Sequence, residues 1–256
     1  MHWVIQDKVF GDETAELIKY AKSYQIAPDC GVYGFGADDP YIVRGTIEFV
    51  KETYGRWDEF SNMPKLLTLK NYTCSKYYQK VPNLLNQDFF ILPWWKLKKC
   101  KHELFNYFDT DEGINRLFIR PNSGKKLFTG TTVGPIWFEK EFDIIKALPS
   151  SNFTEDTLVV VAKQQKIWSE RRFVMHENTI ITSAVYGDYS QADDGPEVYS
   201  DLVKSNTYYP DDFYTIDVCM TENGPKIVEL NSMVCAGLYD CDYEKVVKSV
   251  ETYYTR

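Results

Sequence analysis

Residues 213–231 read FYTIDVCMTENGPKIVELN, and this stretch predicts two β-strands joined by a tight turn. Its two halves, residues 214–220 and 226–230, alternate β-branched or aromatic residues with others, as strands do. The Asn223-Gly224 pair between them is typical of a hairpin turn, because these residues accept positive backbone φ. We therefore expect a hairpin whose strands pair symmetrically about Asn223.

This register predicts that Asp217 lies opposite Glu229 and that Asn231 follows on the same face of the sheet. The other face then carries apolar residues suited to a core, namely Val218, Met220, Val228 and Leu230. Two carboxylates and an amide oxygen are hard ligands of the kind that Mg²⁺ or Mn²⁺ binds together with substrate phosphates. A solvent-facing polar row would show the same alternation, and a bulge would shift it, so this stretch alone leaves both interpretations open.

The composition is that of a globular protein with an acidic surface. The chain has 256 residues, 44% hydrophobic and 26% charged, with a formal net charge of −8. This charge argues against non-specific nucleic-acid binding, although a local basic cleft is compatible with it. The basic run 96–101 is interpreted as a solvated helix face. No apolar run is long enough to cross a bilayer, so we expect a cytoplasmic protein without a membrane partner.

The cysteines and histidines do not indicate a metal site of their own. The six cysteines form no CxxC pair, and the chain has only three histidines. Zinc sites built from these residues show closer and more regular spacing. We expect the cysteines to be reduced and structural.

The first 60 residues predict a small α/β layer. Residues 3–6 form a short apolar strand, and residues 14–24 have helical spacing of apolar positions. A second strand is expected at 41–44, followed by a helix that runs to Tyr54. This order of elements favours a separate N-terminal α/β domain over residues 1–84.

Residues 116–130 place cations around a flexible turn. A strand ends at Arg120, a turn follows at 122–125, and Lys126 is expected to begin the return strand. Two cations and the backbone amides of such a loop can hold a polyphosphate. An ordinary surface hairpin would carry similar charges, and this stretch alone does not separate the two.

The remaining elements follow from alternation and helical spacing. A strongly β-forming stretch at 157–162 ends in Lys163. Strands at 169–175 and 179–186 predict another hairpin, with Arg172 near the start of its first strand. Helices are expected at 138–148, 197–208 and 243–254.

Taken together, four stretches resemble the ATP-grasp superfamily. They are FIRPNSGKKLFTG (118–130), LVVVAK (158–163), ERRFVMHENTIITSAVY (170–186) and FYTIDVCMTENGPKIVELNS (213–232). In detail they are similar to a clade found in bacteria and their phages, which is named for two arginines and one lysine in its active site. The resemblance implies an ATP-grasp fold of the α+β (α/β) class over residues 85–256. Its two α+β subdomains would sandwich the nucleotide, and the small α/β domain would precede them.

The resemblance also implies roles for individual residues. Asp217, Glu229 and Asn231 match the Mg²⁺ ligands. Arg120 stands at the position near the α- and β-phosphates, and Lys163 ends the strand that borders the adenine. Lys126 matches the lysine after the phosphate-covering loop, with Lys125 as the alternative. Arg172 matches the arginine that leans toward the γ-phosphate. Arg171 is the alternative, and the alternation of the strand favours Arg172, with Glu170 on the same face. Arg172 and Lys126 are the residues assigned to catalysis.

The implied function is an ATP-dependent carboxylate–amine ligase that works through an acyl phosphate with Mg²⁺ or Mn²⁺. Its partners would be ATP, a carboxylate substrate and an amine acceptor, which could be an amino acid, a peptide or a protein. Phosphoryl transfer needs positioning, a divalent metal and cations rather than a protein nucleophile, which agrees with the residues present. The alternative is a non-catalytic ATP-binding regulatory or interaction module. A metal-dependent hydrolase built on Asp217 and Glu229 would need more ligands than the nearby sequence offers.

Overall fold

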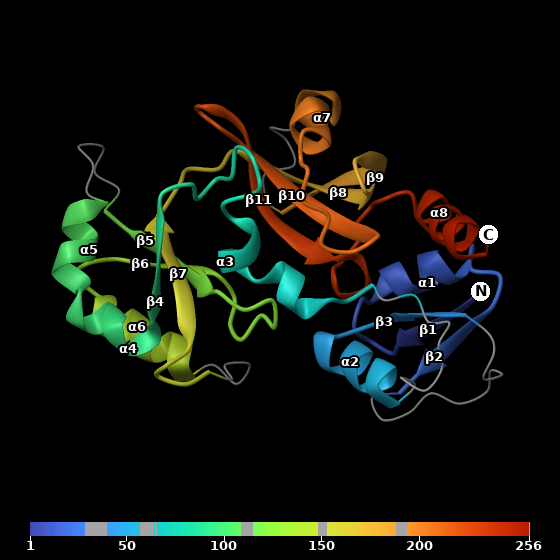
Figure 1. The fold of residues 1–256 in the computed structure, drawn as a ribbon, viewed down its shortest axis with the longest axis horizontal. Coiled ribbons are helices and arrows are strands. Elements are labelled where there is room, and N and C mark those ends of the chain that lie inside the picture. Colours follow the sequence, from blue (N-terminus) through green and yellow to red (C-terminus); the bar gives the residue numbers. More distant parts are fainter. Residues whose placement is uncertain are drawn as a thin grey trace. The chain divides into compact units, whose positions relative to one another are not determined.

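A computed structural model describes residues 1–28, 40–56, 64, 66–108, 115–147, 153–187 and 194–255. The chain forms two compact α+β units, coloured along the sequence in Figure 1. Unit 1 combines residues 1–68 with 167–256, and unit 2 comprises residues 69–166. The predicted domain boundary between residues 84 and 85 lies inside unit 2, and it stays a prediction about the extent of the ATP-grasp module.

The N-terminal part of unit 1 is a three-stranded parallel sheet in the order β2-β1-β3. The strands are β1 (His2–Gln6), β2 (Tyr24–Ala27) and β3 (Tyr41–Arg44), and the helices are α1 (Asp12–Ile18) and α2 (Ile47–Arg56). The expected small α/β layer is therefore present. The predicted helix over 14–24 is wrong at its C-terminal end, because Tyr24 pairs with Trp3 and begins β2. Strand pairing satisfies the backbone there and overrides the local helical spacing.

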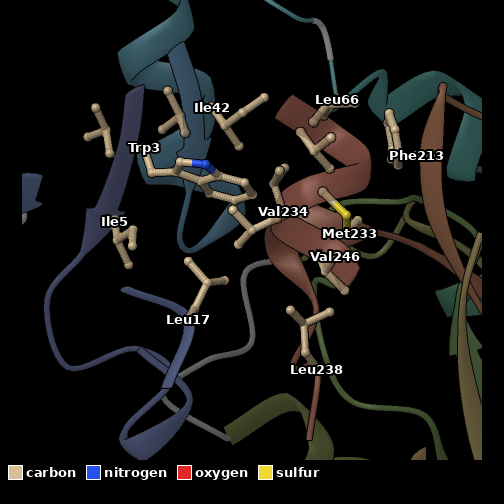
Figure 2. Close-up of a cluster of buried hydrophobic side chains, with 14 of the residues drawn as sticks. Trp3, Ile5, Leu17, Ile42, Leu66, Phe213, Met233, Val234, Leu238 and Val246 are labelled. Carbon is tan, nitrogen blue, oxygen red and sulfur yellow. The ribbon is translucent and has the colours of Figure 1, made fainter. Parts of the chain in front are cut away.

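The C-terminal helix shares its core with this N-terminal sheet. Helix α8 (Tyr243–Tyr254) matches the expected bounds, and its Val246 packs in the same buried cluster as Trp3 (Figure 2). The indole Nε1 of Trp3 also donates a hydrogen bond to Glu251 at 3.3 Å. Sequence-distant ends of the chain thus build one hydrophobic core.

The second sheet of unit 1 carries the predicted hairpin. Its four antiparallel strands stand in the order β11-β10-β8-β9. They are β8 (Ser169–His176), β9 (Thr179–Tyr186), β10 (Phe213–Thr221) and β11 (Gly224–Ser232). Helix α7 (Glu197–Lys204) precedes β10 and is shorter than expected, and the 3-10 turn η3 (Met233–Cys235) follows β11.

The register of the hairpin confirms its central pair and corrects its core face. Asp217 pairs with Glu229, as predicted, and Gly224 in the turn has φ +86°. A bulge after Asp217 then shifts the register, so Val218 pairs with Ile227 rather than with Val228. Ile227 is consequently fully buried, while Val228 is only half-buried. The bulge adds one residue to β11, so the β11 side chains between the bulge and the turn point to the face opposite to the predicted one.

Unit 2 is a four-stranded antiparallel sheet in the order β4-β7-β5-β6. The strands are β4 (Phe89–Pro93), β5 (Leu117–Pro121), β6 (Thr131–Val133) and β7 (Leu158–Lys163), and the helices are α3 (Cys74–Tyr77), α4 (Trp94–Lys99), α5 (Lys101–Tyr107) and α6 (Phe138–Ala147), with the 3-10 turn η1 (Leu69–Tyr72). Its core is aromatic, with Trp94 stacked on Phe142 at 3.8 Å between ring centroids. The return strand begins at Thr131 and not at Lys126, because residues 122–130 form a loop.

Within the described part of the chain, the structure contains no helix that is both long and apolar enough to cross a membrane.

Candidate nucleotide and metal site

Arg172 and Asp217 form a buried ion pair on the second sheet of unit 1. Strands β8 and β10 place the two residues directly opposite each other. Arg172 Nε donates to Asp217 Oδ1 and Nη2 donates to Oδ2, both at 2.6 Å. Arg171 instead pairs with Val218 and donates to Ser183 Oγ at 2.9 Å. Of the two arginines that the sequence left open, Arg172 is therefore the one beside the predicted metal ligands.

Asn231 connects the two carboxylates of the hairpin. Its Nδ2 donates to Asp217 Oδ2 at 3.1 Å and to Glu229 Oε1 at 2.8 Å. The three predicted metal ligands thus lie together on one sheet face, with Arg172 beside them. Turning the Asn231 amide would present its Oδ1 to the same place, as a metal ligand requires.

The donor set of this cluster fits a hard divalent cation. No three His, Cys, Asp or Glu side chains gather closely enough to hold a metal ion within the residues that the structure describes. A cation here would therefore use Asp217, Glu229 and the Asn231 amide oxygen, with phosphate oxygens completing its shell. Oxygen-only sets of this kind suit Mg²⁺ or Mn²⁺. The residues present fit the expected ion.

The charge of Arg172 is stabilised by its carboxylate partner. Burial acts to lower the pKa of Arg172, but the charge of Asp217 and its hydrogen bonds outweigh burial and raise the pKa. The guanidinium therefore remains positive at any physiological pH. A permanent cation at this position can interact with a phosphate without proton exchange.

The Arg172 guanidinium lies beside a stacked pair of tyrosines. The rings of Tyr186 and Tyr239 are parallel within 3°, with centroids 4.6 Å apart. The guanidinium carbon lies 5.4 Å from the Tyr186 centroid and 5.0 Å from that of Tyr239. Arg172 Nη1 also donates to the Gly237 carbonyl at 2.6 Å. Cation–π contacts and this hydrogen bond together fix the orientation of the side chain.

Glu170 adds a third carboxylate next to the cluster. It lies two residues before Arg172 on β8 and accepts a hydrogen bond from Tyr186 Oη at 3.3 Å. Burial and then the charge of Asp217 raise its pKa above that of an ordinary glutamate. The negative charge of Asp217 thus acts on Glu170, and a cation bound between Asp217 and Glu229 would offset that charge.

The predicted cations of unit 2 occupy two different faces of its sheet. Arg120 in β5 pairs with Val160, whereas Lys163 at the end of β7 pairs with Leu117. Since side chains alternate along a strand, Arg120 and Lys163 point to opposite faces. Lys163 shares its face with the buried Leu117, and Arg120 lies on the other one.

Lys125 and Lys126 lie in the loop between β5 and β6. Both side chains are exposed, and Lys126 has φ +50°, an uncommon conformation for a residue with a Cβ. Gly124 is needed in this loop, because a Cβ there would lie 2.7 Å from the Leu69 carbonyl oxygen. The structure does not separate the roles of the two lysines, and the choice of Lys126 stays a prediction.

Sequence reasoning missed Tyr186, Tyr239 and Gly237. Tyr186 pairs with Glu170 across β8 and β9, so the alternation of that hairpin could have placed it on this face. Tyr239 and Gly237 lie in an irregular segment after β11. No strand or helix periodicity predicts the direction of side chains in such a segment. Their contact with Arg172 is a product of tertiary structure.

Comparison of sequences identifies a protein family. A model of the ATP-grasp domain matches residues 99–249, which is more than half of the chain. This model describes family 2 of the ATP-grasp clade that is named for two arginines and one lysine. No curated protein matches the chain in sequence.

Comparison of structures finds several ligases with a similar fold. D-cycloserine synthetase DcsG has a TM-score of 0.67 at 9% identity, over 99% of this chain and 100% of its own. D-alanine–D-alanine ligase from Bacillus anthracis, complexed with ATP, has a TM-score of 0.60 at 13% identity, over 100% and 97%. The ATP-grasp ligase PsnB complexed with a minimal precursor has a TM-score of 0.55 at 11% identity, over 100% and 99%. At these identities the likeness concerns the fold.

Proposed function

Since this chain belongs to the ATP-grasp domain family, in family 2 of the clade named for two arginines and one lysine, we propose that it is an ATP-dependent ligase that joins a carboxylate to an amine. The ATP-grasp fold and the clade expected from the sequence are both confirmed. Proteins of this fold catalyse ATP-dependent ligation in general. The substrates, the intermediate and the metal are the content of the proposal.

The proposed reaction has two steps. A carboxylate oxygen of the substrate attacks the γ-phosphorus of ATP, which forms an acyl phosphate and releases ADP. The amine then attacks the acyl carbon, the C–O bond to phosphate breaks, and the amine loses a proton. The products are an amide, ADP and inorganic phosphate, and no covalent bond to the protein is needed.

The cluster on β8, β10 and β11 carries the proposal. Asp217, Glu229 and Asn231 would hold Mg²⁺ or Mn²⁺, which neutralises phosphate charge when bound. Arg172 would contact the γ-phosphate and the charge that develops during its transfer. The tyrosine pair and the Gly237 carbonyl hold Arg172 in place, so it needs little reorganisation during the reaction.

The cations of unit 2 complete the proposed set. Arg120 is assigned to the α- and β-phosphates, Lys126 to the covering loop and Lys163 to the adenine border. Cations of these types bind phosphates through charge-assisted hydrogen bonds. Lys125 remains the alternative to Lys126.

The substrates are proposed to be amino acids or peptides. Two of the similar structures are a D-alanine–D-alanine ligase and a ligase complexed with a precursor peptide. The fold alone does not fix the choice of substrate. Residues 72–108 of unit 2 and residues 187–200 of unit 1 are each proposed to influence the choice of substrate, although 188–193 fall outside the described residues.

The proposal is tested by ADP release. The purified protein is incubated with ATP and Mg²⁺, with and without mixtures of amino acids or short peptides, and ADP is measured. ADP release that depends on both a carboxylate and an amine supports a ligase. ATP binding without such turnover would indicate the non-catalytic module instead, and absence of ATP binding would contradict both.

A further inference from the structure

We propose that Glu13, in the first turn of α1, is a positioning residue for Arg172 in the proposed ATP site. This inference rests on the proposed function, because the role of Arg172 is to bind the γ-phosphate. Glu13 does not touch Arg172 itself. It acts through residues 237–239, called here the tyrosine loop, which contacts Arg172 on one side and Glu13 on the other.

The Glu13 carboxylate is anchored to the backbone of the tyrosine loop. Its Oε2 accepts from Leu238 N and its Oε1 accepts from Tyr239 N, both at 2.8 Å. Arg44 Nη2 donates to Oε2 at 3.1 Å, so a third donor holds the same carboxylate. Hydrogen bonds to an ionised acceptor are stronger than neutral ones. These contacts join residues about 225 positions apart in the sequence.

Arg44 fixes Glu13 within the core of unit 1. Arg44 is 2% exposed, and its guanidinium carbon lies 3.9 Å from the Phe10 ring centroid. Its Nη1 donates a hydrogen bond to the Met233 carbonyl at 2.7 Å. Glu13 is therefore not a mobile surface carboxylate, because its partner is rigidly packed. The segment that leads into the tyrosine loop is bound at Met233, and the loop itself is bound at Leu238 and Tyr239.

The backbone of Tyr239 needs such support. Its φ is +53°, in the left-handed region that residues with a Cβ rarely adopt. The hydrogen bond from Tyr239 N to Glu13 is made in this conformation. Space is also limited, since a Cβ on Gly237 would lie 3.2 Å from Glu13 Oε1. The loop conformation and the Glu13 carboxylate are thus mutually dependent.

The tyrosine loop transmits this support to Arg172. The Gly237 carbonyl accepts from Arg172 Nη1 at 2.6 Å, and the Tyr239 ring lies 5.0 Å from the guanidinium. If the loop relaxes, Arg172 loses a hydrogen-bond acceptor and one of its two aromatic neighbours. Arg172 would still be charged and paired with Asp217, but its orientation toward a phosphate would be less defined.

The test uses two nucleotides that differ at the γ-phosphate. Dissociation constants for ATP and for ADP, each with Mg²⁺, are measured by calorimetry for the wild type, Glu13→Gln and Glu16→Gln. Glu16 is the matched control, because it lies on the same helix and its carboxylate pairs with the exposed Lys19. We expect Glu13→Gln to weaken ATP binding about tenfold and to leave ADP binding unchanged.

The outcomes separate the inference from the proposed function. Equal weakening of ATP and ADP binding, or no weakening of either, would overturn the positioning role. A folded wild type that binds neither nucleotide would instead overturn the proposed function. Should Glu13→Gln fail to fold by circular dichroism, Glu13→Asp replaces it. That variant keeps the negative charge beside Arg44 but shortens the side chain by one methylene. It should also weaken ATP binding and not ADP binding, by a smaller factor than Glu13→Gln.

Discussion

The Arg172 guanidinium binds the Asp217 carboxylate through two parallel hydrogen bonds of 2.6 Å. The two side chains are 5% and 1% exposed, so the pair is almost fully removed from water. Removing either member of such a buried pair leaves the other charge uncompensated and destabilises the folded protein. In the proposed site the same two residues would bind phosphate and metal, so the ion pair keeps both groups in place before ATP arrives.

Asp217→Asn is expected to destabilise the protein strongly. Removing one partner leaves the Arg172 charge buried and uncompensated, which costs about 3–5 kcal/mol in comparable pairs. The free energy of unfolding is measured by urea denaturation. The control is Glu244→Gln, which removes the exposed pair with Lys248 and should leave stability close to the wild-type value. Similar stabilities for the two variants would contradict the structural importance of the buried pair.

Glu229→Gln is expected to abolish stabilisation by ATP with Mg²⁺ while leaving the protein folded. Glu229 is less buried than Asp217 and accepts a hydrogen bond from Asn231, which a glutamine oxygen can also accept. When ATP with Mg²⁺ is present at about 100 times its Kd, the free energy of unfolding of the wild-type protein should increase by about 2.7 kcal/mol. The control is Glu222→Gln, an exposed carboxylate in the turn of the same hairpin. A thermal shift in Glu229→Gln equal to that of the wild type would remove Glu229 from the proposed metal site.

The hairpin shows how far the sequence leads and where it stops. The Asn-Gly turn and strand alternation predict the hairpin, but the observed turn pairs Thr221 with Gly224, and this register alone would set Asp217 opposite Val228. The bulge adds one residue to β11, buries Ile227 instead of Val228 and brings Glu229 opposite Asp217, and no local pattern in the sequence marks it. In the same way, helical spacing extended the first helix to Tyr24, whereas pairing with Trp3 makes that residue a strand.

The Arg172–Asp217 pair depends on non-local structure. The sequence placed both residues in strands and favoured Arg172 over Arg171 by alternation, but only the pairing of β8 with β10 sets Arg172 opposite Asp217. The hydrogen bonds of Glu13 and Gly237 join segments that no local pattern connects. Long-range contacts in an irregular loop are set by packing of the whole unit, so they become visible only in the structure.

Glu170→Gln should become more stable relative to the wild type as pH rises. The folded protein raises the pKa of Glu170 through burial and then the charge of Asp217, so the folded state binds its proton more tightly than the unfolded state. Its stabilising contribution is full below the unfolded pKa of about 4.3 and is lost as pH rises through the folded value. Glutamine has no such titration.

The measurement is urea unfolding of both proteins without metal, from about pH 4, near the ordinary glutamate pKa, to about pH 8. The difference in the free energy of unfolding should grow with pH in favour of Glu170→Gln. Glu222→Gln serves as the control with an exposed carboxylate. A difference that is constant with pH would contradict the raised pKa.

The buried cysteines are expected to resist alkylation in the folded protein. Burial raises the pKa of Cys219 and of Cys241 to about 12, so little reactive thiolate forms at pH 8. Cys100 and Cys235 are only half-buried and should react before them. The test is iodoacetamide labelling at about pH 8, near the ordinary cysteine pKa, followed by peptide mass analysis. Rapid labelling of Cys219 in folded protein would contradict its packing role, and labelling after urea treatment confirms that the peptide is detectable.

Arg120 and Lys163 are expected to affect different parts of the nucleotide. The register of β5 and β7 places them on opposite faces of the sheet, so they are not equivalent phosphate ligands. Arg120, assigned to the α- and β-phosphates, should contribute more to ATP than to AMP, which lacks the β-phosphate. Lys163, assigned to the adenine border, should contribute equally to both. Loss of a charge-assisted hydrogen bond costs about 1.5–3 kcal/mol, or at least tenfold in affinity.

These assignments are separated by calorimetric titration of Arg120→Met and Lys163→Met with ATP and with AMP, each in the presence of Mg²⁺. Arg120→Met should weaken ATP binding more than AMP binding, and Lys163→Met should weaken both by the same factor. Lys99→Met, an exposed lysine on α4, is the control for loss of a surface charge. If Lys163→Met shows the preference expected of Arg120→Met, the phosphate contact belongs to the other face of the sheet. The assignment of Arg120 would then be wrong.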